Sequence, residues 1–244
     1  MASLTGNYRP EHRFVLRQNL ELYDALQLQI QACDTEIENL LLALAAIQDP
    51  VEVPPARSKR KPRQNEPRFE IQPALCRLAG ADITQIDTIG PYNGLKLIAE
   101  IGTDMSRWPT ERHFASWTTL APRRKTSGNR VLSSRTQPSA NRAAAILRLC
   151  AMVAGRTDTA LGAYYRRLAY RIGKPKAITA TARKIAILVY RVLRGDLDYR
   201  DPGAQVYEAQ HRARTLHHLR KRARNLGFDL VDLNADDIPT ESVS

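Results

Sequence analysis

A serine followed by a glycine, Ser127-Gly128, lies in the most basic loop of this chain. Hydroxyl oxygens of serine can attack phosphorus when nearby cations stabilise the negative charge that develops on the phosphoryl oxygens. The stretch of thirteen residues around Ser127 supplies five such cations, which are Arg123, Arg124, Lys125, Arg130 and Arg135. These residue types allow phosphoryl-transfer chemistry with Ser127 as the nucleophile.

A general base for Ser127 is not evident in the same loop. Between Leu120 and Arg135 the chain has neither a histidine nor a carboxylate that could accept the hydroxyl proton. On the residues alone, the simpler interpretation is a turn serine that hydrogen-bonds the backbone or a phosphate. The same interpretation applies to Ser133, Ser134 and Ser139.

The charge around this loop has one sign. Between Arg112 and Gly195 there are eighteen Lys or Arg residues and a single acid, Asp158. Such a surface repels itself unless a polyanion neutralises it, and Lys and Arg release condensed counterions when they meet phosphates. The sequence therefore predicts a nucleic acid as partner, and DNA is the expected one.

Composition narrows the class of protein further. The chain has 244 residues and a formal net charge of +12, with a pI of about 10.0. Cys33, Cys76 and Cys150 are odd in number and far apart, so they suggest neither a disulfide framework nor a zinc site. No segment has the apolar length of a membrane span or a signal peptide. We expect a cytoplasmic protein with no membrane partner.

The N-terminal segment, residues 1–49, has a heptad pattern of apolar residues. The a positions are Leu16, Tyr23, Ile30, Ile37 and Leu44, and the d positions are Asn19, Leu26, Cys33, Leu40 and Ile47. This pattern predicts a long coiled-coil helix from about Pro10 to Gln48, with Asn19 as a polar insert that fixes the register. The helix packs on a second copy, giving a homo-oligomer, on an antiparallel partner helix, or on the protein's own core.

A basic, proline-rich segment follows at residues 50–70. Six of the fourteen prolines lie between Pro50 and Pro73, and a run of cations lies among them; such composition buries too little apolar area to fold. We expect a disordered linker there, a compact helical domain over residues 71–227 and a frayed acidic tail over residues 228–244.

The start of the helical domain has the pattern of a helix-hairpin-helix element. Residues 82–95 lead into residues 97–102, with Gly90 and Gly94 around the hairpin and Gly102 closing the second helix. In such an element, backbone N–H groups at the glycine turn face a phosphate. We expect Gly90 and Gly94 to contact nucleic acid.

Four further helices are predicted. Ser139 is the expected N-cap of the first, which would bury Ile146, Leu147, Cys150 and Val153. The second would bury Leu161, Tyr165, Leu168 and Ile172 before Gly173; the third runs from Pro175 to Gly195, and the last from about Ala204 to Leu226. The expected outward-facing cations of the second and third are Arg166, Arg167, Arg171, Arg183, Lys184, Arg191 and Arg194.

Many short words of this sequence occur in one order in a known family. They are residues 82–87 (DITQID), 99–107 (AEIGTDMSR), 113–117 (HFASW), 120–122 (LAP), 127–128 (SG), 131–135 (VLSSR), 141–145 (NRAAA), 155–163 (GRTDTALGA), 165–168 (YRRL) and 179–185 (TATARKI). Over about residues 69–227 the chain resembles the C-terminal transposase domain of DEDD-type insertion-sequence transposases of family 110/116/902. The helix before it is similar to that family's coiled coil.

The resemblance implies a transposase in which Ser127 is the nucleophile and Gly128 permits the turn. It also implies a homo-oligomer and a structured bridge RNA that pairs with DNA. In the family, a RuvC-like domain binds Mg²⁺ through four carboxylates. We expect that domain to be missing here, so that this chain binds no cofactor itself and is inactive alone. Besides the five cations of the loop, Arg142 is expected to contact nucleic acid.

Three positions depart from the family pattern. Thr88, Thr119 and Asn129 stand where the family usually has glycine. Because glycine adopts positive φ at little cost and threonine does not, we expect altered or strained backbone at these positions.

The sequence thus predicts a mainly α protein that binds DNA for site-specific transposition. Two alternatives stay open: a non-catalytic helix-hairpin-helix nucleic-acid-binding module, and an oligomerisation protein in which the charge is incidental.

Overall fold

The fold is mainly helical. The computed structural model describes residues 6, 9–48, 53–55 and 66–231. Its helices are α1 (Pro10–Ala46), α2 (Ile71–Ala79), α3 (Pro91–Ile101), α4 (Glu111–Trp117), α5 (Arg142–Ala154), α6 (Ala160–Ile172), α7 (Lys174–Leu193) and α8 (Ala204–Asn225), with 3₁₀ turns η2 (Ile83–Gln85) and η3 (Met105–Arg107). Strands β1 (Lys125–Ser127) and β2 (Arg130–Ser133) form one antiparallel hairpin. Most of the predicted linker and tail, residues 49–52, 56–65 and 232–244, lie outside the described residues.

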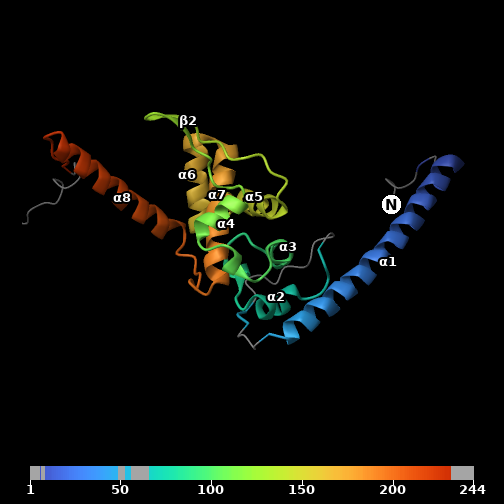
Figure 1. The fold of residues 1–244 in the computed structure, drawn as a ribbon. Coiled ribbons are helices and arrows are strands. Elements are labelled where there is room, and N and C mark those ends of the chain that lie inside the picture. Colours follow the sequence, from blue (N-terminus) through green and yellow to red (C-terminus); the bar gives the residue numbers. More distant parts are fainter. Residues whose placement is uncertain (1–5, 7–8, 49–52, 56–65, 232–244) are drawn as a thin grey trace, which may run out of the picture.

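The long N-terminal helix is confirmed. α1 begins at Pro10, whose fixed φ suits the first turn of a helix, and it leaves the body of the molecule as an extended arm (Figure 1). Only Leu41 and Ala45, near its C-terminal end, are buried, where α1 packs on α2. The heptad seam is not on that buried side, because Leu41 and Ala45 occupy e and b positions. The seam therefore does not lie on the protein's own core.

α7 is the central helix of the body. It packs against α4, α5 and α6, while α3 joins α2 to α5. Ala182, Ile185 and Val189 of α7 are fully buried, as their spacing predicts. Tyr190 is also buried, and its hydroxyl donates a hydrogen bond of 2.7 Å to the backbone oxygen of Trp108. This bond fixes the segment before α4 against the central helix α7. The hairpin follows α4 in the chain.

The predicted helix ends are mostly correct. Gly173 and Gly195, with φ of 84° and 74°, follow α6 and α7 as expected. The expected N-cap Ser139 was wrong: Asn141 caps α5 by accepting a hydrogen bond from Ala144 N, and Ser139 Oγ instead accepts one from Asn141 N. Val153 and Ile172 are exposed rather than buried. Buried alanines of α5 take the place assigned to Val153, because close packing on α7 favours small side chains.

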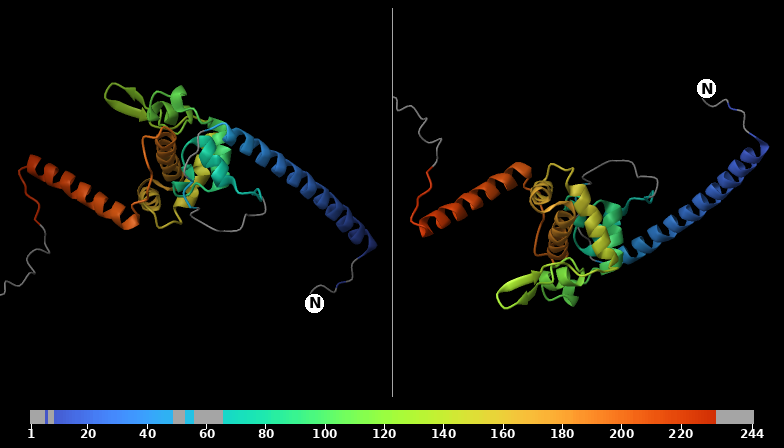
Figure 2. Two further views of the ribbon diagram at one scale, coloured as in Figure 1. Left: turned by 90° about the horizontal axis from the view of Figure 1, so that it is seen from below. Right: turned by 90° about the horizontal axis from the view of Figure 1, so that it is seen from above.

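α8 extends away from the body on the side opposite α1 (Figure 2). Only Ala204 and Tyr207, in its first turn, are buried. That first turn packs on α6, and its Tyr207 ring partly covers Arg167 and Lys184. These two residues and Arg183 are half-buried, so the expectation that they face outward was wrong. For Arg167 and Lys184 the reason is that a helix from further along the chain lies over them.

Candidate nucleic-acid interface

Ser127 lies at the tip of a hairpin, where the sequence predicted an irregular loop. Ser127 is paired with Arg130, and Gly128 and Asn129 form the two-residue turn between them. Gly128 has a φ of 55° and Asn129 a negative φ, the pattern of a type II′ turn, which favours glycine at its first central position. Gly128 therefore has the structural role that the Ser-Gly motif requires.

The five cations around Ser127 all lie on this hairpin or at its base. Arg123 N donates to Arg135 O at 3.0 Å, which continues the strand pairing beyond β1 and β2. All five side chains are exposed, and within the described residues none of them forms an ion pair. The hairpin thus presents uncompensated positive charge on both sides of the serine hydroxyl. Val131 and Leu132 are exposed on the same hairpin.

Ser127 has no general base nearby in the part of the chain that the structure describes. Its hydroxyl is exposed and has no hydrogen-bond partner among those residues. The same residues contain no group of three or more His, Cys, Asp or Glu side chains arranged to hold a metal ion. Within the described residues, the hairpin therefore supplies cations beside the Ser127 hydroxyl and no group hydrogen-bonded to it.

The segment predicted to be a helix-hairpin-helix holds the 3₁₀ turn η2 and one continuous helix, α3, so the predicted hairpin around Gly94 was wrong. Gly90 is the N-cap of α3, with free space around its Cα. Gly94 lies inside α3, where an added Cβ would come within 2.9 Å of Leu75 Cδ2. Close packing of α3 on α2 is sufficient reason for a glycine at position 94 and needs no ligand. A phosphate contact at Gly90 stays a prediction.

Arg142 is the first residue of α5, at some distance in sequence from the hairpin. Its side chain is exposed and lies 3.3 Å from a carboxylate oxygen of Glu100 on α3. An exposed ion pair of this kind contributes little to stability, so the guanidinium can exchange Glu100 for a phosphate at small cost.

Two of the three departures from glycine coincide with strained backbone. Thr88 and Thr119 have φ of 79° and 56°, and no other non-glycine residue described has a positive φ. The hydroxyl oxygens of both are buried without a hydrogen-bond partner among the described residues. The expectation of strain is thus confirmed at Thr88 and Thr119, while Asn129 has an ordinary φ.

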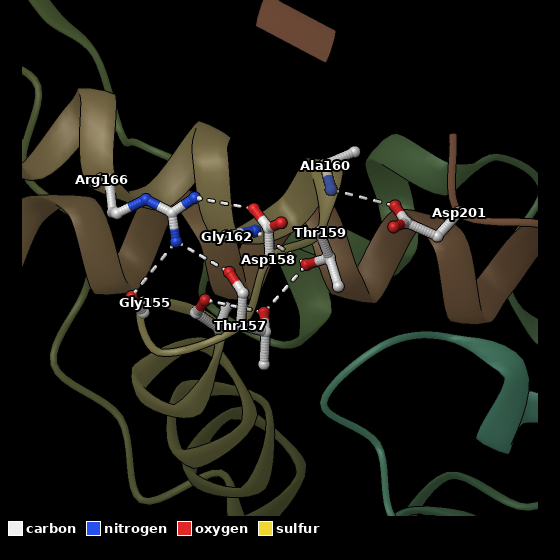
Figure 3. A network of polar contacts seen from close by, with 9 residues as sticks. Gly155, Thr157, Asp158, Thr159, Ala160, Gly162, Arg166 and Asp201 are labelled. Carbon is white, nitrogen blue, oxygen red and sulfur yellow. Dashed lines mark hydrogen bonds and ion pairs between the residues drawn. The ribbon is translucent and has the colours of Figure 1, made fainter. Parts of the chain in front are cut away.

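The turn between α5 and α6 is held by a dense polar network (Figure 3). Thr159 caps α6 by accepting from Gly162 N at 3.1 Å, and Arg166 donates to the backbone oxygen of Thr157 at 2.7 Å. From the segment before α8, Asp201 accepts from Ala160 N at 3.0 Å. The motif of residues 155–163 therefore has a structural role, because its polar groups fix the start of α6.

A second basic cluster was not predicted. It brings Tyr164 and Arg167 of α6, Lys184 of α7, and Tyr207 and His211 of α8 together. The basic character of each helix was visible in the sequence. The clustering depends on the first turns of α8 packing onto α6, for which the sequence carries no local signal.

Comparison with known proteins agrees with the motifs. Residues 80–166, just over a third of the chain, match the sequence model of the family described as Transposase IS116/IS110/IS902 family. No curated protein matches the chain closely enough to count as a relative. Among the described residues, no helix is both long and apolar enough to cross a membrane. Residues 80–166, which include the serine hairpin, therefore match the IS116/IS110/IS902 transposase family, and this match supports a function related to transposition.

Proposed function

We propose that this chain binds DNA in site-specific transposition and carries the serine nucleophile of the reaction. The observation that supports this most directly is the hairpin, where Ser127 is exposed at the tip and flanked by five cations without ion-pair partners among the described residues. An exposed hydroxyl at a tip can reach a phosphate of an intact duplex, which a buried one could not do. The guanidinium groups beside it would neutralise charge on the phosphoryl oxygens.

In the proposed step, Ser127 Oγ forms a bond to phosphorus and the bond from phosphorus to the departing deoxyribose oxygen breaks. The hydroxyl proton passes to a base, and the departing oxygen takes up a proton. The described residues supply neither the base nor a carboxylate set for Mg²⁺. We therefore propose that a RuvC-like domain outside the described residues completes the site, so that the described part is the serine-bearing half.

Two further partners belong to the same proposal. The exposed heptad seam of α1 supports assembly into a homo-oligomer, because an apolar stripe of that length is stable only when it is covered. The cations of α8 support binding of a second polyanion, and a structured bridge RNA is the partner that the family resemblance implies.

A second candidate function is a non-catalytic nucleic-acid-binding module. The absence of any proton acceptor near Ser127 among the described residues favours it. In that case the hairpin binds the nucleic-acid backbone, and Ser127 only stabilises the turn or donates a hydrogen bond to a phosphate.

The two candidates differ in whether a covalent serine–DNA adduct forms. The test incubates the chain with a nicked suicide duplex, Mg²⁺ and a RuvC-like domain supplied in trans, and detects the adduct by denaturing electrophoresis. We expect Ser127→Ala to abolish the adduct without weakening DNA affinity. Ser134→Ala is the matched control, since Ser134 is an exposed serine just beyond β2, and it should leave the adduct unchanged.

An adduct that survives Ser127→Ala would show that the nucleophile is another residue. If the wild-type chain binds the duplex and never forms an adduct, the non-catalytic module is the better description.

DNA binding by the hairpin has its own test. Replacing Arg123, Arg124 and Lys125 with Gln should lower the slope of log affinity against log salt by up to about 2.7, because each phosphate that the variant no longer neutralises accounts for roughly 0.9. The control changes the same number of charges on and beside α1, at Arg9, Arg13 and Arg17. An equal decrease in both triple variants would mean that the hairpin does not bind the duplex specifically.

A further inference from the structure

The cluster between α6, α7 and α8 is built around two tyrosine rings. Lys184 Nζ lies 4.5 Å from the ring centre of Tyr164 and 5.3 Å from that of Tyr207. The guanidinium carbon of Arg167 lies 5.0 Å from the ring centre of Tyr207, and the same group donates a hydrogen bond to the Tyr207 hydroxyl. The rings of Tyr164 and Tyr207 meet edge to face, so α6 and α8 are joined through aromatic contacts lined by cations.

The positive charge of this cluster is uncompensated. Nη1 of Arg167 and Nε of Arg183 are buried and have no hydrogen-bond partner among the described residues. Within the same residues, no carboxylate forms an ion pair with Arg167, Arg183 or Lys184. Buried donors without acceptors destabilise a fold, and like charges at short range add to the cost. The arrangement is favourable only if an anion completes it.

A cavity opens directly beside these groups. Its volume is about 250 Å³, and its lining residues are Ala163, Arg166, Arg167, Tyr207, Glu208 and His211. Guanidinium, imidazole and phenol groups are donors that suit phosphate oxygens, and arginine suits them best because its donors form a planar fork. Glu208 is the one carboxylate in the lining, and its negative charge opposes an anion there.

The electrostatics of the neighbouring groups agree with an anion site. Burial, followed by the charges of Arg167, Arg214 and Arg171, lowers the pKa of His211. Burial, followed by the charges of Arg167 and Arg214, likewise lowers the pKa of Lys184. Every cation that acts on these groups comes from α6 or α8, and a bound dianion would reverse the effect.

We propose that this cavity binds a phosphate group of a nucleic-acid backbone and thereby fixes the base of α8 on α6 and α7. The inference rests on the proposed function, in which the partner is a nucleic acid. A backbone phosphate is favoured over a free one because α8 continues from the cavity as an exposed basic helix on which a backbone could run. Its exposed cations are Arg212, Arg214, Arg220, Lys221, Arg222 and Arg224.

The first experiment measures thermal unfolding of the whole chain with inorganic phosphate, against sodium chloride of equal ionic strength. Phosphate should raise the Tm of the wild type beyond the chloride effect. Arg171→Gln and Arg214→Gln each remove an exposed cation whose charge acts on His211 at the cavity, without removing a packed side chain, and each should weaken apparent phosphate affinity by roughly tenfold. Glu208→Gln should strengthen it, because the opposing carboxylate is gone.

A control variant and an independent signal keep this test specific. Arg220→Gln removes an exposed cation further along α8 and should leave phosphate affinity unchanged. The pKa of His211, followed by NMR, should rise when phosphate binds to the wild type. No rise in Tm beyond that of chloride, together with an unchanged His211 pKa, would overturn the proposal.

A second arm identifies the source of the phosphate. With a short DNA duplex, Arg214→Gln should lower the salt slope by about 0.9, whereas Arg13→Gln, on α1 and away from the cluster, serves as the reference. If inorganic phosphate raises the Tm but neither Arg171→Gln nor Arg214→Gln changes DNA affinity, the cavity does not bind a backbone phosphate. The Gln variant of Arg123, Arg124 and Lys125 should keep phosphate protection, so failure at the hairpin and failure at this cavity are distinguishable.

Discussion

Thr119 holds a backbone conformation that its side chain disfavours. A β-branched residue at positive φ is strained, and here the hydroxyl is also buried without a partner among the described residues. The neighbouring Thr118 is the opposite case: its φ is −70° and its hydroxyl donates to Ala115 O at 3.1 Å. The two adjacent threonines between α4 and the hairpin therefore have opposite effects on stability.

Thr119→Gly is expected to raise the free energy of unfolding by about 1 kcal/mol. Relief of strain and removal of the unpaired hydroxyl outweigh the greater freedom of glycine in the unfolded chain. Thr118→Gly should lower it, since a satisfied buried hydroxyl and a well-packed side chain are removed. Urea unfolding of both variants measures the difference. A loss of stability in Thr119→Gly as large as in Thr118→Gly would show that position 119 is not strained.

Asp82 gives the fold a pH dependence. Burial raises the pKa of its carboxyl, but hydrogen bonds from Thr84, Gln85 and Gln72 outweigh burial and hold the pKa below its usual value. The stability that Asp82 contributes is therefore complete above the unfolded-state pKa, near about 3.9, and is lost as the pH falls through the lower folded-state pKa.

Asp82→Asn should accordingly destabilise the chain at pH 7, and its difference from the wild type should shrink below about pH 4. Asp104→Asn is the control, because Asp104 caps η3 in the same way but is fully exposed, so its effect should be smaller at every pH. Urea titrations between pH 7 and pH 3 test this. A difference at Asp82 that does not change with pH would mean that the charge contributes nothing.

Gly162 decides whether α6 can begin where it does. A Cβ on this residue would lie 2.2 Å from the backbone oxygen of Thr157 and 2.8 Å from that of Ala154. Neither oxygen can move without breaking the turn, because Arg166 donates to Thr157 O and Thr157 Oγ1 donates to Ala154 O.

Gly162→Ala should therefore destabilise the fold by about 1–3 kcal/mol even though alanine favours helices. The matched control is Gly90→Ala, at a glycine with ordinary φ where an added Cβ would have no atom within 4 Å; as the N-cap of α3 it should lose only a small part of that amount. Thermal unfolding of the two variants gives the comparison. Equal Tm values would show that the α5–α6 turn adapts freely.

The elements differ in how far the sequence could predict them. Apolar periodicity predicted α1, α6 and α7, and glycine marked where α6 and α7 end, because these signals are local. The hairpin was missed since its strands are short and mostly polar, so that no alternation of apolar residues marks them. Asn141 and Ser139 are both suitable N-caps, and only the packing of α5 chooses between them. The cluster around Tyr207 depends on contacts between distant segments.

The whole molecule presents its interaction surfaces on separate projections. α1 and α8 leave the body in opposite directions, and the hairpin projects on the side of α8 (Figure 2). The a and d residues of α1 are exposed along its length, among them Leu26, Ile30 and Leu40. Exposed apolar surface of this extent marks an interface. A second copy that covers it would place two hairpins and two basic helices in one assembly.

Cys33 reports the arrangement of that assembly. It is exposed at a d position, so a parallel, in-register pair of α1 helices brings the two thiols together, whereas an antiparallel pair separates them. Burial, and for Cys76 also the charge of Asp82, raises the pKa of Cys76 and Cys150 to about 12, which keeps both thiols protonated and unreactive. Mild oxidation therefore joins two chains only through Cys33.

Ile30→Asp should dissociate the oligomer, because it places a charge at an a position in the middle of the seam. Leu28→Asp is the matched control: Leu28 is equally apolar and more exposed, at 66 % against 51 %, but it occupies an f position away from the seam. Sedimentation should show a lower mass for Ile30→Asp and an unchanged mass for Leu28→Asp. If the seam is parallel, Ile30→Asp should also lose the disulfide cross-link through Cys33.

Loss of the oligomer should also weaken DNA binding. Because two hairpins on one DNA bind with a high effective concentration, Ile30→Asp should lower DNA affinity by at least about tenfold while every cation stays in place. An unchanged mass in Ile30→Asp would exclude the seam as the interface, and an unchanged affinity in a dissociated variant would mean that each chain binds DNA independently.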